Sequence, residues 1–313
     1  MTVAGQRLLL SAYQRATHGG LLPRRRLGFG ARSLYCIGGG DDGRCVEVFD
    51  VDEQTWREGP PLDVHQLYGC AVGFNGKVYL VGGRDDDDTV VASVSILDPR
   101  VGAWQAGPAL TQARIHAGVA LLDDKIYVCG GHDRNALASV EVFDPQLDAW
   151  HAGPALSTAR YGVGVAALDG KLYAVGGRAG LEYLSSVEVY DPQLGVWQSG
   201  PALRTSRVYA GAAAFDGKLY VVGGLGNTSS GLSSVEVLDP TVGSWQPGPP
   251  LPCALRLCYA FVLNGQLYLT GTHSGTAKMF VLDPTKSNEW QPAPVSPKMS
   301  VVAACFPIRC YMV

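Results

Sequence analysis

The 313-residue sequence predicts an all-β fold, in which six units of four antiparallel strands form the blades of a β-propeller. Three observations support this prediction. Residues 114–154, 160–201 and 207–249 are copies of one another in register, six tryptophans recur 45 to 48 residues apart, and adjacent glycines precede each of the first five tryptophans. Since a lone four-stranded sheet cannot bury both faces, such units stack radially and fill the gaps between them with facing side chains.

Within one copy, apolar residues alternate or run in short blocks, as strands require. We expect strands over 116–122, 125–131 and 139–144, and a fourth that carries Trp150 and stops at Gly153-Pro154. The first two strands are joined across Asp123-Asp124, where the sister copies have Asp-Gly. Asp-Gly supplies the positive φ of a tight hairpin, and the Asp-Pro that ends the third strand favours a turn.

Three markers define the six units. The tryptophans are Trp56, Trp104, Trp150, Trp197, Trp245 and Trp290. The glycine pairs are Gly38-Gly39, Gly82-Gly83, Gly130-Gly131, Gly176-Gly177 and Gly223-Gly224, with Thr270-Gly271 in the last unit. A tyrosine precedes each pair by three residues: Tyr35, Tyr79, Tyr127, Tyr173, Tyr220 and Tyr268.

This pattern resembles the kelch repeat, and the resemblance covers roughly residues 33–313. It implies a six-bladed kelch propeller. The motif Asp-Gly-Lys-Leu-Tyr, repeated with Ser-Ser-Val-Glu-Val, is most similar to the propeller of BTB-kelch ubiquitin-ligase adaptors, although no BTB region is present in these residues. The resemblance therefore implies a protein-interaction module, used as the substrate-recognition part of such an adaptor.

The first 32 residues differ from the rest in charge. Residues 1–40 hold six arginines and no acid, so the remaining residues carry 19 basic and 28 acidic side chains, a net charge of −9. We therefore separate residues 1–32, a basic leader that is either disordered or an organelle-targeting segment, from a propeller over 33–313. The expected location is cytoplasmic, with organelle targeting through residues 1–32 as the alternative. No apolar run is long enough for a membrane helix.

The first unit lacks a convincing first strand, since residues 28–32 read Gly-Phe-Gly-Ala-Arg. Residues 298–306, Lys-Met-Ser-Val-Val-Ala-Ala-Cys-Phe, match the apolar pattern of 160–168. We predict that this C-terminal segment completes blade one and removes the open edges of the ring.

Comparison of the units also predicts an ion pair. Arg114, Arg160 and Arg207, which open the first strands, occur with Glu141, Glu188 and Glu236 on the third strands. Both members are missing from unit two, which has Gln66 and Ser95, and from unit six, which has Leu255 and Phe280. Since buried charges are usually paired, we expect these arginines to be internal clamps, although the family resemblance makes them candidates for gripping acidic peptides. In blade one the same reasoning pairs Glu47 with Lys298.

The loops after the glycine pairs vary most between units, which is typical of a binding face on a repeat scaffold. The candidate binding residues on this face are Arg84, Arg178, Arg256, His132, Tyr183, Asp85, Asp86 and Asp87. With Asp41, Asp42 and Asp88, the aspartates could form an acidic patch for a basic partner or a divalent cation, or simply a solvated loop. The tryptophans and the glycine pairs from Gly82 to Gly224 are structural candidates.

The sequence offers little for catalysis. The eight cysteines show no zinc-site spacing, no nucleotide-binding or hydrolase motif stands in a credible context, and we expect no metal and no cofactor. The expected partner is a protein or peptide bound to a monomeric propeller, with no nucleic acid and no membrane. The alternative is an enzyme of the oxidase or sugar-epimerase type that uses the central pocket.

Overall fold

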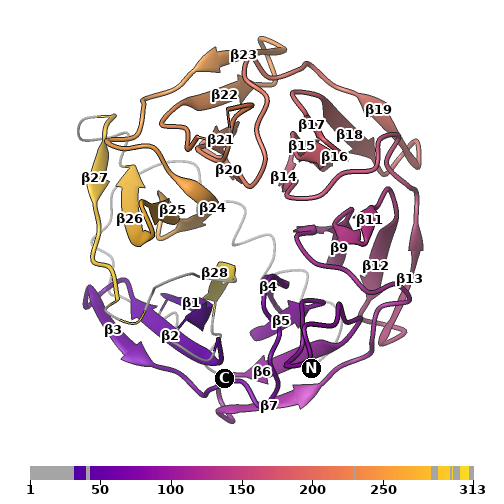
Figure 1. The fold of residues 1–313 in the computed structure, drawn as a ribbon, viewed down its shortest axis with the longest axis vertical. Coiled ribbons are helices and arrows are strands. Elements are labelled where there is room, and N and C mark those ends of the chain that lie inside the picture. Colours follow the sequence, from indigo (N-terminus) through magenta and orange to yellow (C-terminus); the bar gives the residue numbers. More distant parts are fainter. Residues whose placement is uncertain are drawn as a thin grey trace, which may run out of the picture. The chain divides into compact units, whose positions relative to one another are not determined.

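Six four-stranded antiparallel sheets are arranged around a central axis (Figure 1). The structure is a computed structural model that describes residues 32–39, 43–228, 230–282, 288–296, 298 and 304–309. The predicted leader lies outside these residues except for Arg32. The all-β, six-bladed propeller predicted from the repeats is confirmed. In the described part of the chain, no helix could cross a membrane.

The blades follow the repeats in chain order. Blade one contains β28 (Ala304–Arg309), β1 (Arg32–Gly39), β2 (Cys45–Asp50) and β3 (Thr55–Glu58). Blade two contains β4 (Cys70–Phe74), β5 (Lys77–Val81), β6 (Val94–Asp98) and β7 (Ala103–Ala106). Blade three contains β8 (Gly118–Leu122), β9 (Lys125–Cys129), β12 (Val140–Asp144) and β13 (Ala149–Gly153).

The second half repeats the plan. Blade four contains β14 (Gly164–Leu168), β15 (Lys171–Val175), β18 (Val187–Asp191) and β19 (Val196–Ser199). Blade five contains β20 (Gly211–Phe215), β21 (Lys218–Val222), β22 (Val235–Asp239) and β23 (Ser244–Pro247). Blade six contains β24 (Arg256–Leu263), β25 (Gln266–His273), β26 (Thr276–Leu282) and β27 (Trp290–Pro292).

The hydrophobic core lies between the sheets rather than within one of them. Each of six apolar clusters joins two neighbouring blades, and the last joins blade six to blade one through Phe261, Met279 and Phe49. The repeated tyrosines and tryptophans meet there: Tyr127 of blade three shares a cluster with Trp197 of blade four. The repeat therefore conserves both aromatic positions because each fills a gap that a single blade leaves open.

The six tryptophans also connect neighbouring blades by hydrogen bonds. Each indole Nε1 donates to a proline carbonyl of the preceding blade at 2.7–2.9 Å. The acceptors, in order from Trp56 to Trp290, are Pro294, Pro60, Pro108, Pro154, Pro201 and Pro249. The bond from Trp56 to Pro294 links blade one to blade six and so closes the ring.

The C-terminal strand also closes the ring, as predicted, but in a different register. Aligning residues 298–306 with 160–168 would place Ala304 opposite Tyr35, because Ala166 pairs with Tyr173 in blade four. The structure pairs Phe306 with Tyr35, so the strand is displaced by two residues and continues to Arg309. Residues 299–303 lie outside the described residues. A two-residue shift preserves the alternation of side chains between the two faces of a sheet, so the apolar pattern did not reveal it.

The glycine pairs are needed where one blade meets the next. Gly130 has a φ of 64°, and a Cβ there would lie 2.4 Å from the carbonyl oxygen of Arg160 in the next blade. Gly131, with a φ of 96°, donates its N–H to the same oxygen at 2.9 Å. Both positions therefore require glycine, for conformation and for close approach.

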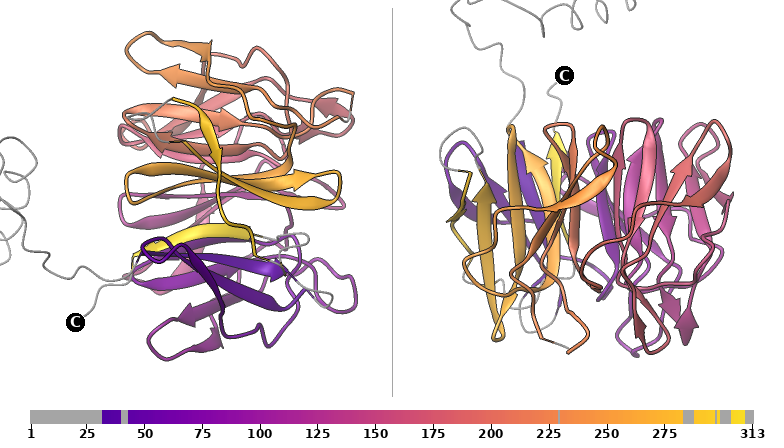
Figure 2. Two further views of the ribbon diagram at one scale, coloured as in Figure 1. Left: turned by 90° about the vertical axis from the view of Figure 1, so that its left-hand side faces the viewer. Right: turned by 90° about the horizontal axis from the view of Figure 1, so that it is seen from above.

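β1 and β28 also show where the chain joins the propeller. Arg32 pairs with Arg309 at one end of β1, and Gly39, of the first glycine pair, is at its other end. Figure 2 shows that the strands of the blades run from one face of the propeller to the other. The strand ends at Arg32 and Arg309 are thus on the face opposite the loops that follow the glycine pairs.

Candidate functional site

The loops after the glycine pairs are fixed to the inner ends of the blades by backbone bridges. Arg84, His132, Arg178 and Leu225 each pair with the residue that follows the clamp position, which is Leu67, Ile115, Tyr161 and Val208 respectively. In blades three and four the loops form small hairpins, β10–β11 (His132–Asp133, Asn135–Ala136) and β16–β17 (Arg178–Ala179, Glu182–Tyr183). The variable loops therefore present equivalent positions in consecutive blades.

Next to these bridges, backbone hydrogen bonds connect one equivalent position, called the ring position, from blade two to blade five. Tyr68, His116, Gly162, Tyr209 and Leu257 occupy one equivalent position in blades two to six, and all five have a φ between 49° and 62°. His116 donates its N–H to the carbonyl of Tyr68 at 3.0 Å, Gly162 to His116 at 2.8 Å, and Tyr209 to Gly162 at 2.8 Å. The left-handed conformation thus turns each backbone toward its neighbour.

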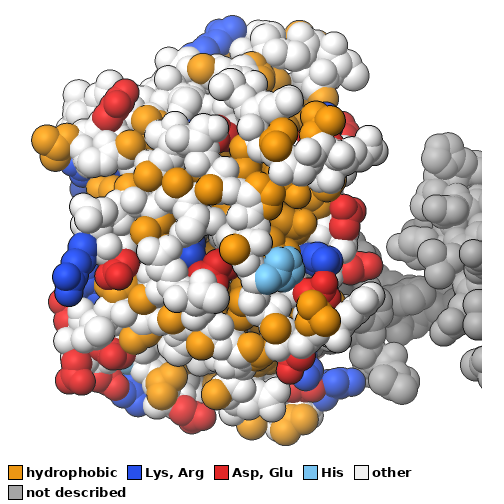
Figure 3. Space-filling model, turned by 90° about the vertical axis from the view of Figure 1, so that its right-hand side faces the viewer, with side chains coloured by type: hydrophobic (Ala, Val, Ile, Leu, Met, Phe, Trp, Pro, Cys, Tyr) orange, Lys and Arg blue, Asp and Glu red, His pale blue; other side chains and the backbone are white. Residues whose placement is uncertain are grey.

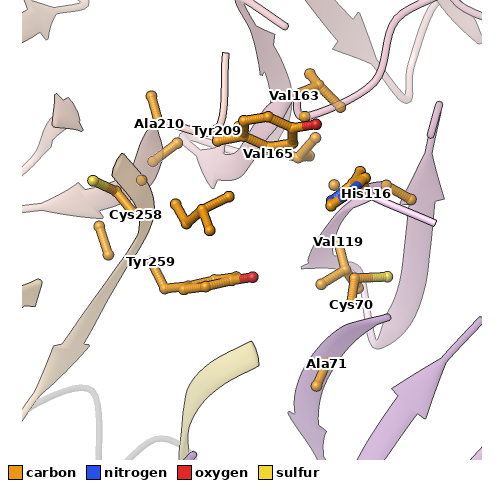
Figure 4. A pocket seen from close by; sticks show the side chains of 18 of the residues that line it. Cys70, Ala71, His116, Val119, Val163, Val165, Tyr209, Ala210, Cys258 and Tyr259 are labelled. Carbon is orange, nitrogen blue, oxygen red and sulfur yellow. The ribbon is translucent and has the colours of Figure 1, made fainter. Parts of the chain in front are cut away.

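Beside these hydrogen bonds lies a pocket of about 240 Å³, lined mostly by small residues of the innermost strands. Figure 4 shows His116, Tyr209 and Tyr259 extending toward its middle from three different blades. Gly162 makes room for this arrangement, because a Cβ there would lie 2.7 Å from the Tyr209 ring. Aromatic side chains from three blades therefore line this pocket.

We call five of these side chains the mouth cluster: Tyr68, His116, His132, Tyr161 and Tyr209. Ring centroids lie 4.8 Å apart for Tyr68 and His116, 4.9 Å for His116 and Tyr209, and 5.7 Å for His116 and His132. Tyr161 contacts His132 at 4.8 Å and Tyr209 at 6.3 Å. The cluster spans blades two to five and provides a broad aromatic surface.

Burial keeps the two histidines of the mouth cluster uncharged at neutral pH. Burial lowers the pKa of His116 to about 4, with smaller contributions from His132 and Arg84. Burial also lowers the pKa of His132 and raises that of Tyr209 to about 12. The charge of this surface is therefore carried by the side chains around the cluster.

The predicted clamps are confirmed, and the structure removes them from the binding face. Arg160 is fully buried, and its Nη2 lies 2.7 Å from Oε1 of Glu188. Its Nη1 donates to the carbonyls of Gly176 and Ser186 at 2.9 and 3.1 Å. Arg114–Glu141 and Arg207–Glu236 repeat this geometry at 2.7 Å.

Blade two makes the same contacts without charge. Gln66 donates to the carbonyls of Gly82 and Ser93 at 2.9 and 3.1 Å, and Ser95 donates to Gln66 at 2.5 Å. Unit six replaces the clamp by buried Leu255 and Phe280.

The predicted partner of Glu47 is wrong. Lys298 forms its ion pair with Glu58, and the hydroxyl of Ser296 donates to Glu47 instead. Glu47 is buried, whereas the Lys298 side chain is half exposed, so the short serine satisfies the carboxylate where the longer lysine reaches outward.

Two of the predicted binding arginines lie beside the mouth cluster, and neither is fully bonded. Arg84 pairs with Asp88 at 2.7 Å, and the Arg178 guanidinium lies 5.1 Å from the centre of the Tyr183 ring. Among the described residues, the Nε atoms of both arginines are buried and have no hydrogen-bond partner. Arg256 is exposed and lies in blade six.

The predicted acidic patch is largely neutralised by its own surroundings. Asp86 accepts from Arg44 of blade one at 2.7 Å, and Asp88 from Arg84. Asp85 accepts the backbone N–H groups of Asp87 and Thr89 at 3.0 and 2.9 Å, which fixes the loop. Asp41 and Asp42 lie outside the described residues.

The structure places four of the predicted binding residues at two sites, a cleft between blades two and three and the hairpin of blade four. Arg84 and His132 line one cleft between the blade-two loop and β10–β11. Tyr183 stacks with Arg178 in blade four, and the ring of His132 contacts His116 and Tyr161. In the described ranges, no three His, Cys, Asp or Glu side chains could together hold a metal ion.

Tyr68, His116, Tyr161 and Tyr209 were missed from the sequence. In the aligned units the ring position reads Tyr, His, Gly, Tyr and Leu in blades two to six, within otherwise similar segments. This variation, two residues after the clamp position, was the signal that could have indicated these site residues.

Away from this face, the rim carries side chains of both charges among scattered hydrophobic ones (Figure 3). Its exposed aliphatic side chains include Val101, Leu147 and Leu194, which occupy the turn after the third strand in successive blades. Each stands in a separate turn, which is normal for surface apolar residues.

Two family models match the chain. The KLHDC2/KLHL20/DRC7 Kelch-repeats domain matches residues 27–202, and the Kelch motif matches residues 206–252. Among curated proteins, the mouse Kelch-like protein 8 is 34% identical over 70 residues, which is 21% of this chain and 11% of that protein. The Arabidopsis thaliana F-box/kelch-repeat protein At4g39550 is 35% identical over 71 residues, which is 22% of this chain and 18% of that protein. These alignments thus span less than a fifth of either relative.

Proposed function

The chain belongs to the kelch-repeat family, and we propose that it binds a partner protein through the face that carries the mouth cluster and the loops after the glycine pairs. One observation carries this proposal. The guanidinium groups of the clamps are bonded within the fold, whereas Arg84 and Arg178, beside the mouth cluster, each have a buried Nε with no hydrogen-bond partner among the described residues. Aromatic and arginine side chains are the types that dominate the binding energy of protein interfaces.

The wider role that we propose is that of the substrate-recognition part of a ubiquitin-ligase adaptor. The support is the resemblance to BTB-kelch propellers and the similarity to an F-box/kelch-repeat protein. The strand ends at Arg32 and Arg309 lie on the opposite face, so a further subunit joined there would leave the mouth cluster accessible.

Affinity capture with the full chain tests the binding proposal. We expect partners to be retained by the natural chain and lost from a variant with His132→Ala, Arg178→Ala and Tyr183→Ala. A matched control carries Lys125→Ala and Lys171→Ala, which remove ion pairs with Asp144 and Asp191 far along the blades from this face. Equal retention by all three chains would contradict the proposed face, and co-purification of a ubiquitin-ligase subunit would support the adaptor role.

A further inference from the structure

Blade six supplies the pocket among the inner strands with an aromatic side chain at a position that is small in blades two to five. Tyr259 of β24 is equivalent to Gly211 of β20, because each pairs with the residue two positions after the repeated tyrosine of its blade. The same position holds Cys70, Gly118 and Gly164 in blades two, three and four. The Tyr259 side chain extends into the pocket that these small residues line (Figure 4).

The glycines at this position are required by the packing of neighbouring blades. A Cβ on Gly118 would lie 2.3 Å from the side chain of Val165, and a Cβ on Gly211 would lie 2.8 Å from the backbone nitrogen of Ala260. The volume left among the inner strands is about 240 Å³. Pockets for drug-sized molecules span ~300–1,000 Å³, so this pocket suits a smaller molecule of one or two rings.

Two polar side chains that line the pocket are available for hydrogen bonds. Within the described residues, neither the His116 imidazole nor the Tyr209 hydroxyl forms a hydrogen bond. Burial lowers the pKa of His116 to about 4 and raises that of Tyr209 to about 12, so both side chains are uncharged at neutral pH. A neutral imidazole can donate from one nitrogen and accept at the other, and a phenol can do both through its oxygen.

The pocket offers no ionic contact, since no Asp, Glu, Lys or Arg is among the described residues that line it. The arginines that precede the inner strands of blades three to five are held in the clamps by ion pairs with buried glutamates. A charged ligand would lose its hydration here without gaining a counter-charge. The pocket therefore favours an uncharged ligand.

From these observations we propose that the pocket binds a small, uncharged aromatic molecule of one or two rings that carries a hydrogen-bonding atom. The ring of the ligand packs against Tyr259, and its polar atom bonds to the hydroxyl of Tyr209. This site goes beyond the proposed function, because it takes a free small molecule rather than a protein. Tyr209 belongs to the mouth cluster as well as to the pocket, so the test uses the purified chain without any partner.

Isothermal titration calorimetry of the full chain with β-naphthol and β-naphthoate tests the proposal. The two probes share a two-ring skeleton, but at neutral pH only β-naphthoate is charged. We expect β-naphthol to bind saturably with one molecule per chain. Binding of β-naphthoate should be at least tenfold weaker, because its carboxylate would be buried without a counter-charge.

Three variants locate the bound probe. Tyr209→Phe deletes one hydroxyl and should weaken the binding of β-naphthol about fivefold, as expected for one hydrogen bond. Tyr259→Ala should weaken it about tenfold, because the aromatic contact is lost. The matched control is Tyr190→Phe, which deletes a hydroxyl in the core between blades three and four, away from the pocket, and should leave the affinity unchanged. Thermal unfolding of each variant shows that the fold is retained.

Two kinds of result would overturn the proposal. The first is the absence of saturable binding of β-naphthol to the natural chain, or equal affinity for both probes. The second is an affinity for β-naphthol that stays the same in Tyr209→Phe and Tyr259→Ala, since the probe would then be bound outside the pocket. Neither result bears on the proposed protein contact, because no partner is present in the titration.

Discussion

Two arginines lie against the glycine pair of blade four, Arg160 through a hydrogen bond to the Gly176 carbonyl and Arg178 as the next residue in the chain, and their bonding is opposite. Arg160 is fully buried, and its guanidinium meets a carboxylate and two carbonyls. Arg178, the residue after Gly176-Gly177, has a buried Nε with no partner among the described residues, and its guanidinium stacks on the Tyr183 ring. The same side chain is thus a component of the fold on one side of the glycine pair and an available donor on the other.

The clamp arginines differ from Arg178 because the carboxylate of each clamp also accepts hydrogen bonds from the backbone. Glu188 accepts not only from Arg160 but also from the N–H groups of Ser157 and Thr158, at 2.6 and 3.0 Å. Those two residues lie in the connection from blade three to blade four. Each glutamate therefore holds the incoming connection in place, whereas Arg178 has no ion pair within the part of the chain that the structure describes.

The largest expected effect comes from breaking one clamp. Glu188→Ala should destabilise the propeller by about 3–5 kcal/mol, because it leaves a buried guanidinium without its counter-charge. The shift of the midpoint in urea unfolding measures the loss. Ser95→Ala in blade two is the matched control and should cost only about 1 kcal/mol, since one neutral hydrogen bond is removed. Equal losses would mean that the charge of the clamp is irrelevant.

A smaller effect is expected when the charged clamp is exchanged for the neutral one. Arg160→Gln together with Glu188→Ser copies Gln66 and Ser95 of blade two, and should be about 1–2 kcal/mol less stable than the natural chain, since the N–H groups of Ser157 and Thr158 lose their acceptor. Urea unfolding of the double variant beside Glu188→Ala decides the point. If the double variant is no more stable than the single one, the similarity of the two clamps is only geometric.

Acid should lower the stability of the folded propeller through the protonation of His116. The folded-state pKa of His116, about 4, lies below its ordinary value of 6.5, so between these values the unfolded chain binds the extra proton and stability falls as the pH falls. The thermal unfolding temperature should therefore decline less from pH 6.5 to pH 4 in His116→Gln than in the natural chain. His151→Gln, at an exposed rim position, is the control and should keep the natural slope. A slope unchanged by His116→Gln would contradict the burial of a neutral imidazole.

The smallest effect on stability is expected at Arg178. Arg178→Ala should change the free energy of unfolding by less than about 0.5 kcal/mol, because no ion pair and no guanidinium hydrogen bond among the described residues is lost. Differential scanning calorimetry against the natural chain checks this. A loss above about 2 kcal/mol would place Arg178 with the clamps and remove it from the binding face.

Much of the fold was predictable because the repeat lets each unit be compared with five others. The joint absence of both clamp residues from units two and six pointed correctly to an Arg–Glu contact, which three ion pairs confirm. The comparison failed in blade one because it considered only a basic residue as the partner of Glu47, although Thr111 of unit three, whose hydroxyl donates to Glu141 at 2.8 Å, was a precedent for Ser296. The register of β28 was also missed, because alternating apolar residues look the same after a two-residue shift.

The candidate site was less predictable, since it depends on which side chains meet across blades. His116 and Tyr209 are 93 residues apart in the sequence and touch only because Gly162 between them has no side chain. Nor could charge counting show that the aspartates after Gly83 are occupied by Arg44, Arg84 and backbone N–H groups. Arg178 stood out from the sequence, but its unused donor is visible only in three dimensions.

The closure of the ring has a consequence for how the blades are numbered. Trp56 reaches Pro294 as every other tryptophan reaches its proline, and β28 places Arg309 beside Arg32. A ring held by equivalent links has no first or last unit. We therefore expect that a short turn joining positions 309 and 32, with the chain opened instead at an exposed hairpin such as Asp216-Gly217, would give the same propeller from a circularly permuted sequence.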